Sequence, residues 1–492
     1  MKKILCIFLL FSSLLSAKSS MTPYLTSESD TLALVDGVIN AYNGKLVQID
    51  PDIEIQGSDP LQLIRYYDGG QQRFDSEFGY GIGMSLPTQL SFDTYEWKRN
   101  MLIEQRMGLE LLFSVKEQKS KKKHKEKTYV GTVDPKCFEL GYTNCCEALL
   151  RGESSLCAMK VAGTKNNFVV TLGDGTKRHY DYFLTEYEIF CYRLVLEEKA
   201  NGNRRHFSYA GDHSIWLSKV CTKNHDDSIT LNWINITYEP DYQVIATASN
   251  GQSVRYQKTL KKGKAKQKIG WQSYVETTYR KWLLTQVSGA HLPTTNFEHL
   301  NRTLYRDTVF SVQKVTKPDG HSLAVEFDSG ERVKKVFSSG VEVPLYTFDY
   351  HSHHTTVQNA LGAVQQFDFS KRRLTKLSEG YRTQNFSWDS KGQLTSHVTT
   401  DPNGNVINKR EYHYDDLGNV VESQIHGQIT SSTSQDCFVL RHTYSKNGRN
   451  LMLTENHNCE KEFSFEYLPN TNLMTRKLTF ADQHFAEREF RG

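Results

Sequence analysis

Short stretches rich in apolar and aromatic residues recur along most of the chain, and turn residues separate them. Residues 167–171 read Asn-Phe-Val-Val-Thr, a Gly-Asp-Gly sequence follows at 173–175, and a second stretch follows the turn. Similar stretches flank the turns at 201–203, 318–320 and 402–404. Such stretches are typical of half-buried strands, and Gly, Pro, Asn and Asp supply the backbone angles of tight reversals. The pattern therefore predicts antiparallel hairpins and an all-β fold.

The C-terminal third repeats one feature, a pair of rings at positions i and i+2. Side chains at i and i+2 point to the same face of a strand, so each pair is expected to pack on one side of a sheet. The second rings stand 19, 26, 30 and 23 residues apart. The pairs are Phe367 and Phe369, Phe386 and Trp388, Tyr412 and Tyr414, His442 and Tyr444, and Phe465 and Tyr467.

A turn and an apolar residue follow each pair. Four residues past the second ring stands Gly392, Gly418 or Gly448, although the first pair lacks the glycine and Thr471 replaces it in the last. Six residues past the second ring stands Leu394, Val420 or Leu473, and Leu374 and Leu451 are displaced by one. This regularity predicts one hairpin per repeat in a stacked or coiled sheet.

These segments resemble a known family. "FSWDSKGQLTS", "YHYDDLGNVVES" and "HTYSKNGRNLM" are similar to the YD repeats of bacterial Rhs proteins, which also occur in wall-associated proteins and teneurins. Residues 40–70 and 78–87 resemble a segment near the start of Rhs proteins, where an Arg-x-Tyr stretch precedes a Gly-rich strand. The resemblance is strongest at 36–90 and 361–475. It implies a spiralling antiparallel β-sheet shell, here incomplete or open because few repeats are present.

Many relatives enclose a C-terminal toxin in such a shell, and some cut themselves at an Asp-Pro-x-Gly-Leu type motif. This sequence stops at Gly492, soon after the last repeat, so no toxin domain is expected. Residues 401–405 read Asp-Pro-Asn-Gly-Asn, with Asn405 where the motif has Leu, and further repeats follow. We interpret them as a turn.

The first seventeen residues have the pattern of an export signal. Lys2 and Lys3 precede an apolar stretch at 4–15, and Ala17 offers a small residue for cleavage. That stretch is too short to span a bilayer. We therefore expect an exported chain in the periplasm, at the cell surface or secreted, without a transmembrane segment. The expected divisions are a signal peptide at 1–17, an N-terminal Rhs-like segment at 18–110, a Lys-rich and Cys-containing insertion at 111–165, a hairpin-rich middle region at 166–360 and the repeat region at 361–492.

Eight cysteines lie outside the signal, and an oxidising compartment favours disulfides among them. The sequence does not choose the pairing. The spacing C-x7-C-C-x10-C lacks the C-x2-C pairs of structural zinc sites, which makes metal the weaker interpretation. The cysteines are Cys137, Cys145, Cys146, Cys157, Cys191, Cys221, Cys437 and Cys459.

The formal net charge of +4 is small for 492 residues and gives no reason to expect nucleic acid as a partner. Two dense basic runs, at 116–127 and 258–268, are expected to be exposed loops, because like charges close together must be solvated. Lys121, Lys122 and Lys123 in the first run are candidate contacts for an anionic surface.

No catalytic, metal or cofactor site is predicted. The common hydrolase and nucleotide-binding motifs do not occur in the sequence, and the three histidines at 351–354 are best explained as a polar hairpin tip. The leading hypothesis is a non-enzymatic shell protein that encloses or binds another macromolecule. A partner chain or self-association through exposed strand edges could complete the shell. The alternatives are a surface module that binds carbohydrate or anionic polymer, an enzyme hidden in the middle region, and a degenerate relic of a longer toxin gene.

Overall fold

A computed structural model describes the chain from residue 33 to residue 489 with internal gaps. The predicted signal at 1–17 and Lys121, Lys122 and Lys123 lie outside the described residues, as do Gly448 and five of the eight cysteines. The gaps are residue 58, 70–74, 77, 87–88, 93–100, 107–108, 119–127, 134–157, 185–189, 212–213, 241–242, 269–273, 305–306, 428–435, 448–449, 459 and 482–483.

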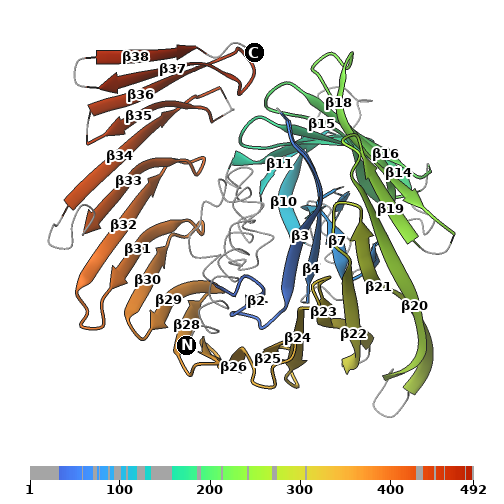
Figure 1. The fold of residues 1–492 in the computed structure, drawn as a ribbon. Coiled ribbons are helices and arrows are strands. Elements are labelled where there is room, and N and C mark those ends of the chain that lie inside the picture. The colour runs from blue at the N-terminus through green and yellow to red at the C-terminus, as the bar shows by residue number, and fades with distance from the viewer. Residues whose placement is uncertain are drawn as a thin grey trace.

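The N-terminal part forms small sheets, and these lie inside a much larger one (Figure 1). β1 pairs with β2, β5 pairs with β6, and β3, β4 and β7 form a three-stranded sheet. Their bounds are β1 (Leu34–Val35), β2 (Ile39–Asn40), β3 (Val47–Ile55), β4 (Leu61–Asp68), β5 (Asp75–Ser76), β6 (Gly79–Tyr80) and β7 (Ile82–Met84).

The large sheet begins with eight strands that close on themselves. Each strand pairs antiparallel with the next, and β15 returns to β8 by pairing Cys191 with Ser91. The strands are β8 (Gln89–Phe92), β9 (Met101–Arg106), β10 (Leu109–Gln118), β11 (Thr128–Val133), β12 (Lys160–Gly163), β13 (Asn167–Thr171), β14 (Lys177–Leu184) and β15 (Phe190–Glu198).

From β15 the sheet continues as a long antiparallel meander, which starts where Leu196 pairs with His206 of β16. It first comprises β16 (Arg204–Tyr209), β17 (Leu217–Lys223), β18 (Thr230–Tyr238), β19 (Gln243–Ala248), β20 (Ser253–Lys268), β21 (Tyr274–Gly289), β22 (Thr295–Leu304), β23 (Asp307–Thr316), β24 (Ser322–Phe327), β25 (Val333–Ser338), β26 (Tyr346–Tyr350) and β27 (His354–Asn359).

It ends with β28 (Val364–Ser370), β29 (Arg373–Glu379), β30 (Arg382–Trp388), β31 (Leu394–Thr400), β32 (Val406–Tyr414), β33 (Val420–Gly427), β34 (Asp436–Tyr444), β35 (Met452–His457), β36 (Glu460–Tyr467), β37 (Met474–Ala481) and β38 (His484–Glu489). In the described part of the chain, β38 pairs only with β37. The predicted all-β spiral with an open end is confirmed.

The N-terminal segment fills the concave side of the first two thirds of this spiral (Figure 1). The Thr355 hydroxyl donates to the Ala41 carbonyl at 2.7 Å, and the Val333 amide donates to the Gly44 carbonyl at 2.7 Å. The rings of Phe78 and Tyr256 meet edge to face with centroids 5.1 Å apart. The shell therefore packs around residues of its own chain here.

Buried charges join this inner segment to the shell. The Arg65 guanidinium binds the Asp52 carboxylate at 3.0 Å, and the Tyr256 hydroxyl of β20 donates to the same carboxylate at 2.9 Å. The Asp52 and Arg65 side chains are only 2% and 3% exposed. Removing one member of such a pair leaves an uncompensated buried charge. The pair therefore favours a single position of β3 and β4 against β20.

The ends of the spiral meet at one described point, where the Asn472 amide donates to the Ala200 carbonyl at 2.9 Å. Asn472 lies in the turn between β36 and β37, and Ala200 lies in the turn between β15 and β16. This contact brings the C-terminal sheet back toward the closed ring.

Two expectations need correction. The basic run 258–268 is not a loop but the greater part of β20, where it pairs residue by residue with β21. The partners on β21 include Val275, Thr277 and Tyr279, residues that favour strands, and this pairing outweighs the repulsion among the lysines. The predicted disulfides do not involve Cys191, Cys221 or Cys437, which are free thiols. The other five cysteines are not described.

Candidate functional site

The second ring of each repeat sits at a β-bulge. The register shifts immediately before Phe369, Trp388, Tyr414, Tyr444 and Tyr467, which leaves one residue of the next strand without a cross-strand partner. Each bulge increases the local twist and bends the strand, so a bulge in every repeat curls the sheet. The residue opposite the second ring is apolar in each repeat. In the first three repeats it is the residue that the spacing predicts, as when Trp388 faces Leu394 and Tyr414 faces Val420. In the last two, Tyr444 and Tyr467 face Met452 and Met474 in place of the predicted Leu451 and Leu473.

The second rings also hydrogen bond backward to the preceding hairpin. The Tyr414 hydroxyl donates to the Leu394 carbonyl at 2.7 Å, and the Trp388 indole nitrogen donates to the Leu374 carbonyl at 2.9 Å. Tyr444 donates to Val420 at 3.1 Å, and Tyr467 donates to Met452 at 2.8 Å. We call this series the tyrosine ladder. It links each hairpin to the one before it.

The tyrosine ladder extends beyond the predicted repeats. Tyr209, Tyr238 and Tyr350 donate to the carbonyls of Leu194, Leu217 and Val333 at 2.7, 2.9 and 2.7 Å. Sequence reasoning missed these three residues. Two of them belong to i and i+2 ring pairs, Phe207 with Tyr209 and Phe348 with Tyr350, so the same search applied upstream would find them.

The turns behave as predicted. Gly392 and Gly418 have φ angles of 80° and 82°, in the left-handed region that favours glycine. Residues 401–405 form a tight turn in which the Asp401 carboxylate accepts the amides of Asn403 and Asn405 at 2.9 and 2.8 Å. The interpretation of Asp401-Pro402-Asn403-Gly404-Asn405 as a turn is therefore confirmed.

The two faces of β30 to β37 differ in chemistry. One face carries opposite charges on neighbouring strands: Arg441 binds Glu422 at 2.6 Å, and Arg476 binds Glu466 at 3.2 Å. The other face carries the repeat rings, and we call it the aromatic face. Trp388 and Tyr412 of this face pack against the hydrophobic core, so it is the inner face of the spiral.

The rings of the aromatic face become less buried toward the C-terminus. Phe367 and Phe386 are 2% and 4% exposed, but Tyr412, Tyr414, His442, Tyr444, Phe465 and Tyr467 are only partly buried. Among the described residues, no hydrophobic side chain after Leu394 is fully buried. Among the described residues, the inner N-terminal segment thus covers the beginning of the aromatic face and leaves the remainder partly open.

The rings of the open part contact one another across the strands. His457 meets Phe438 and Phe463 edge to face with centroids 5.3 and 5.8 Å apart, and the Lys477 ammonium lies 3.9 Å from the centre of Phe463. Burial, reinforced by Asp415 and Glu455, raises the pKa of Tyr444 to about 12, so its hydroxyl remains a donor at neutral pH. The ten predicted ring residues thus lie on one face, and sequence reasoning missed Phe438 and Phe463 beside them.

The other features considered from the sequence are a metal site, the histidine-rich hairpin tip and a membrane span. They contain no cluster of His, Cys, Asp and Glu that could hold a metal ion. His351 and His354 lie at a tight hairpin tip with stacked rings 4.3 Å apart, as expected. Within the described part of the chain there is no helical segment that could span a bilayer.

The comparisons with known proteins concern the repeat region first. The family model described as RHS Repeat matches residues 388–425, which contain Trp388, Gly392, Tyr412, Tyr414 and Gly418. This match confirms the resemblance drawn from the repeat segments. No curated protein matches the chain.

Several solved structures are similar at low identity. The TcdB2-TccC3-TEV structure is 9% identical, with a TM-score of 0.35, and the match covers 88% of this chain and 23% of that one. The Tc holotoxin pore of Photorhabdus luminescens is 9% identical with a TM-score of 0.27, covering 88% and 27%. The N-terminal domain of effector protein SpvB from Salmonella typhimurium is 9% identical with a TM-score of 0.21, covering 60% and 100%. This chain therefore spans about a quarter of the length of the first two.

Proposed function

The chain carries an RHS repeat, and on that premise we propose that it is a binding protein whose open aromatic face holds a partner polypeptide. In this proposal the chain catalyses no reaction. The observation that supports it is the asymmetry of the C-terminal sheet, whose outer face is lined with ion pairs and whose inner face is lined with half-buried rings.

Half-buried rings are a source of binding energy. Full burial of a Phe side chain contributes about 1.5–3 kcal/mol, so covering the part of a partly buried ring that remains exposed would contribute at most about 1 kcal/mol. Phe438, Phe463 and Phe465 together could thus supply up to about 3 kcal/mol. These rings contact one another through His457 and directly, and a cluster of partly exposed apolar side chains can mark an interaction site in a soluble protein.

The sheet edge adds a second means of holding a polypeptide. β38 pairs on one side with β37, and its other side has no partner among the described strands. The amide and carbonyl groups of such an edge can accept an extended segment of another chain as an added strand. An apolar face beside an open edge suits a polypeptide that is at least partly extended.

The carbohydrate alternative is less well supported by this geometry. Sugar stacking needs a flat ring face that is open to solvent, whereas Phe438 and Phe463 flank His457 edge to face and Lys477 lies over Phe463. The proposal places the protein outside the cytoplasm because of the export pattern at 1–17. N-terminal sequencing of the exported chain should begin near Lys18, and a start at Met1 would contradict cleavage of the predicted signal; absence of the chain from the extracytoplasmic fraction would contradict export.

The binding test uses reduced, carboxymethylated α-lactalbumin as a soluble unfolded polypeptide, with affinity measured by fluorescence anisotropy. The variant Phe438→Ser/Phe463→Ser should weaken binding at least tenfold, because it removes two rings from the aromatic face. The control Val439→Ser alters a neighbouring position on the other face of β34 and should leave affinity within about twofold. Failure of the parent protein to bind, or equal affinity of all three proteins, would overturn the proposal.

A further inference from the structure

The hairpin β20–β21 projects from the shell as a two-stranded ribbon (Figure 1). β19 pairs with β20 only as far as Gln257, and β22 pairs with β21 only at Gln286 and Val287. Beyond these points the two strands pair only with each other among the described residues. The free part, from Lys258 to Lys268, extends about 35 Å at about 3.3 Å per residue.

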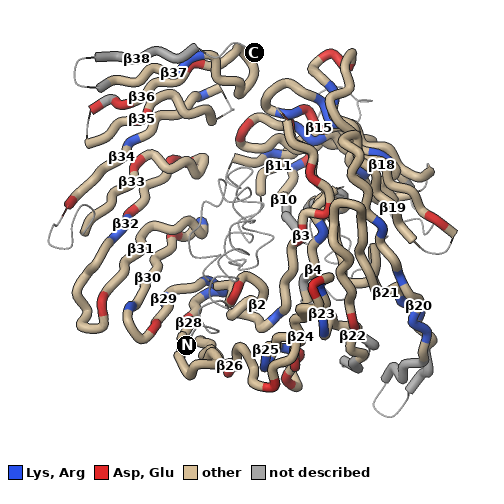
Figure 2. The backbone as a smooth tube through the Cα atoms, viewed as in Figure 1, with Lys and Arg blue, Asp and Glu red and all other residues tan. Residues whose placement is uncertain are grey.

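This ribbon concentrates positive charge. Residues 258–281 contain eight Lys and Arg residues and one acidic residue, Glu276, which gives a formal charge of +7 against +4 for the whole chain. Figure 2 shows the basic positions that follow one another along β20. The lysines at 258, 262, 264, 266 and 268 are spaced by two or four residues, so these positions fall on one side of the strand.

The other side of the ribbon faces the protein. Tyr279 and Leu283 of β21 pack with Tyr80 and Phe310, and the Lys281 ammonium lies 4.6 Å from the centre of the Tyr80 ring. The Tyr279 ring also lies over Gly263, where a Cβ atom would approach the Tyr279 hydroxyl to 2.2 Å. These contacts hold the base of the ribbon on one side. On the other side Leu284 is buried at the base, whereas Lys262 and Arg280 farther along are exposed.

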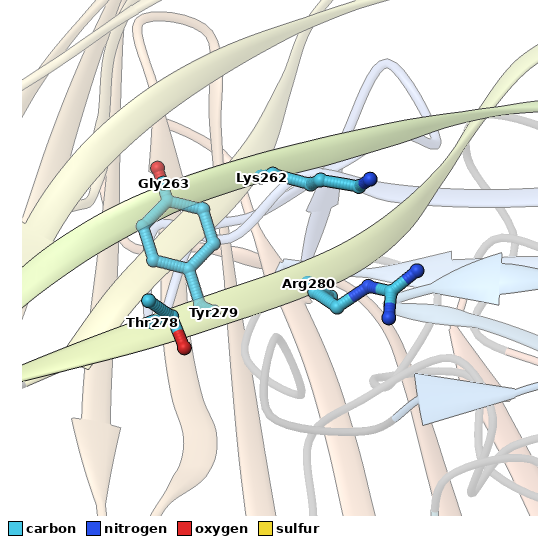
Figure 3. A pocket seen from close by; sticks show the side chains of 5 residues that line it. All are labelled: Lys262, Gly263, Thr278, Tyr279 and Arg280. Carbon is cyan, nitrogen blue, oxygen red and sulfur yellow. The ribbon is translucent and has the colours of Figure 1, made fainter.

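Like charges stand directly opposite each other on the ribbon. Lys262 pairs in register with Arg280, and both side chains are exposed and extend in the same direction (Figure 3). Neither has a carboxylate partner among the described residues. Opposed like charges destabilise a sheet by a few tenths to about 1 kcal/mol per pair. Elsewhere Arg204 stands opposite Lys223 but binds Asp227, which neutralises it.

A shallow hollow surrounds this pair of cations. It measures about 390 Å³ and is lined by Lys262, Gly263, Thr278, Tyr279 and Arg280 (Figure 3). An ammonium, a guanidinium and a hydroxyl can together donate hydrogen bonds to the oxygens of a phosphate group. An anion at this place would also relieve the repulsion between the two cations.

We propose that the basic side of the β20–β21 ribbon binds the phosphate headgroups of an anionic lipid surface. Trp282 and Leu260 pair in register next to Arg280 and Lys262, on the same side of the ribbon. Tryptophan beside basic residues is typical of segments that lie at a membrane interface. Apart from Arg280, the basic residues of the ribbon are lysines, which bind phosphate as point charges and do not make the bidentate base contacts by which arginine reads nucleic acid.

Binding of the full chain to vesicles tests this proposal. Cosedimentation with phosphatidylcholine vesicles is compared with cosedimentation when phosphatidylglycerol is included. The parent should bind only the anionic vesicles, and raising the salt concentration should release it. The variant Lys262→Gln/Arg280→Gln should bind about 25-fold more weakly, because each cation near an anionic surface contributes about fivefold, or about 1 kcal/mol.

The matched control is Lys335→Gln/Arg441→Gln, which removes the same two charge types from ion pairs on the shell. It should lower vesicle binding by less than threefold, and circular dichroism should show that both variants are folded. Equal losses in the two variants would overturn the assignment to the ribbon. Absence of binding to anionic vesicles, or tighter binding to duplex DNA or polyphosphate than to vesicles, would overturn the lipid surface as the partner.

Discussion

Tyr414→Phe removes one hydrogen bond of the tyrosine ladder and keeps the ring. The substitution deletes the hydroxyl that donates to the Leu394 carbonyl at 2.7 Å, while the ring stays opposite Val420. A hydrogen bond of this kind contributes about 0.5–1.5 kcal/mol net, and Leu394 is only 3% exposed, so water replaces the lost donor poorly. We therefore expect Tyr414→Phe to lower the free energy of unfolding by about 1 kcal/mol.

Equilibrium urea unfolding followed by tryptophan fluorescence measures this change. The control Tyr381→Phe removes a hydroxyl from a side chain that is 63% exposed, and it should change stability by less than about 0.5 kcal/mol. Ladder bonds in successive hairpins are about 10 Å apart, two strand spacings, so the losses from Tyr414→Phe and Tyr467→Phe should add. If Tyr414→Phe and Tyr381→Phe shift the urea midpoint equally, the tyrosine ladder does not stabilise the spiral.

Three further predictions concern the turns and the titrating groups. Gly392→Ala should destabilise more than Gly404→Ala in thermal unfolding: both have positive φ, but only at 392 would the new Cβ meet another group, the Arg373 guanidinium at 2.1 Å. Burial raises the pKa of Tyr444 to about 12, so the stability that this phenol contributes is present below about pH 10 and is lost as pH rises to 12. Tyr444→Phe should flatten that alkaline loss in pH-dependent urea unfolding. Burial would raise the pKa of Glu197, but Lys199, Arg178 and Arg205 hold it well below its usual range, so its contribution is present above about pH 4.5 and is lost on further acidification. Glu197→Gln should lower stability at pH 7 by about 3 kcal/mol or more and should flatten the acid-induced loss.

The repeat architecture was predictable because it depends on the spacing of residues that lie close together in the sequence. A ring pair, a glycine turn and an apolar residue fix one hairpin, and the bulge before Tyr414 or Trp388 places that apolar residue opposite the second ring. The phenol hydroxyl was harder to interpret, since nothing in the sequence distinguishes a tyrosine that donates to the previous hairpin from one that only packs. The same spacing upstream, at Phe207 with Tyr209, carries the same information.

Contacts over long sequence distances could not be predicted. Asp52 and Arg65 look like surface charges in an alternating strand, yet they are buried against Tyr256, about 200 residues away. Their burial depends on the N-terminal segment filling the spiral, which no local pattern indicates. The lysines at 258–268 led to a wrong prediction for a related reason. Repulsion among them predicts an exposed loop, whereas their partners on β21, which the local sequence does not identify, favour a strand.

Photo-crosslinking tests most directly whether the open aromatic face holds a polypeptide. Benzoylphenylalanine replaces Phe463 on the aromatic face in one protein and Val439 on the opposite face in another, and each is irradiated with reduced, carboxymethylated α-lactalbumin. If the aromatic face holds the polypeptide, position 463 gives a covalent adduct and position 439 gives none above background. Adducts of equal yield from both positions, or an adduct from position 439 alone, would contradict binding at this face.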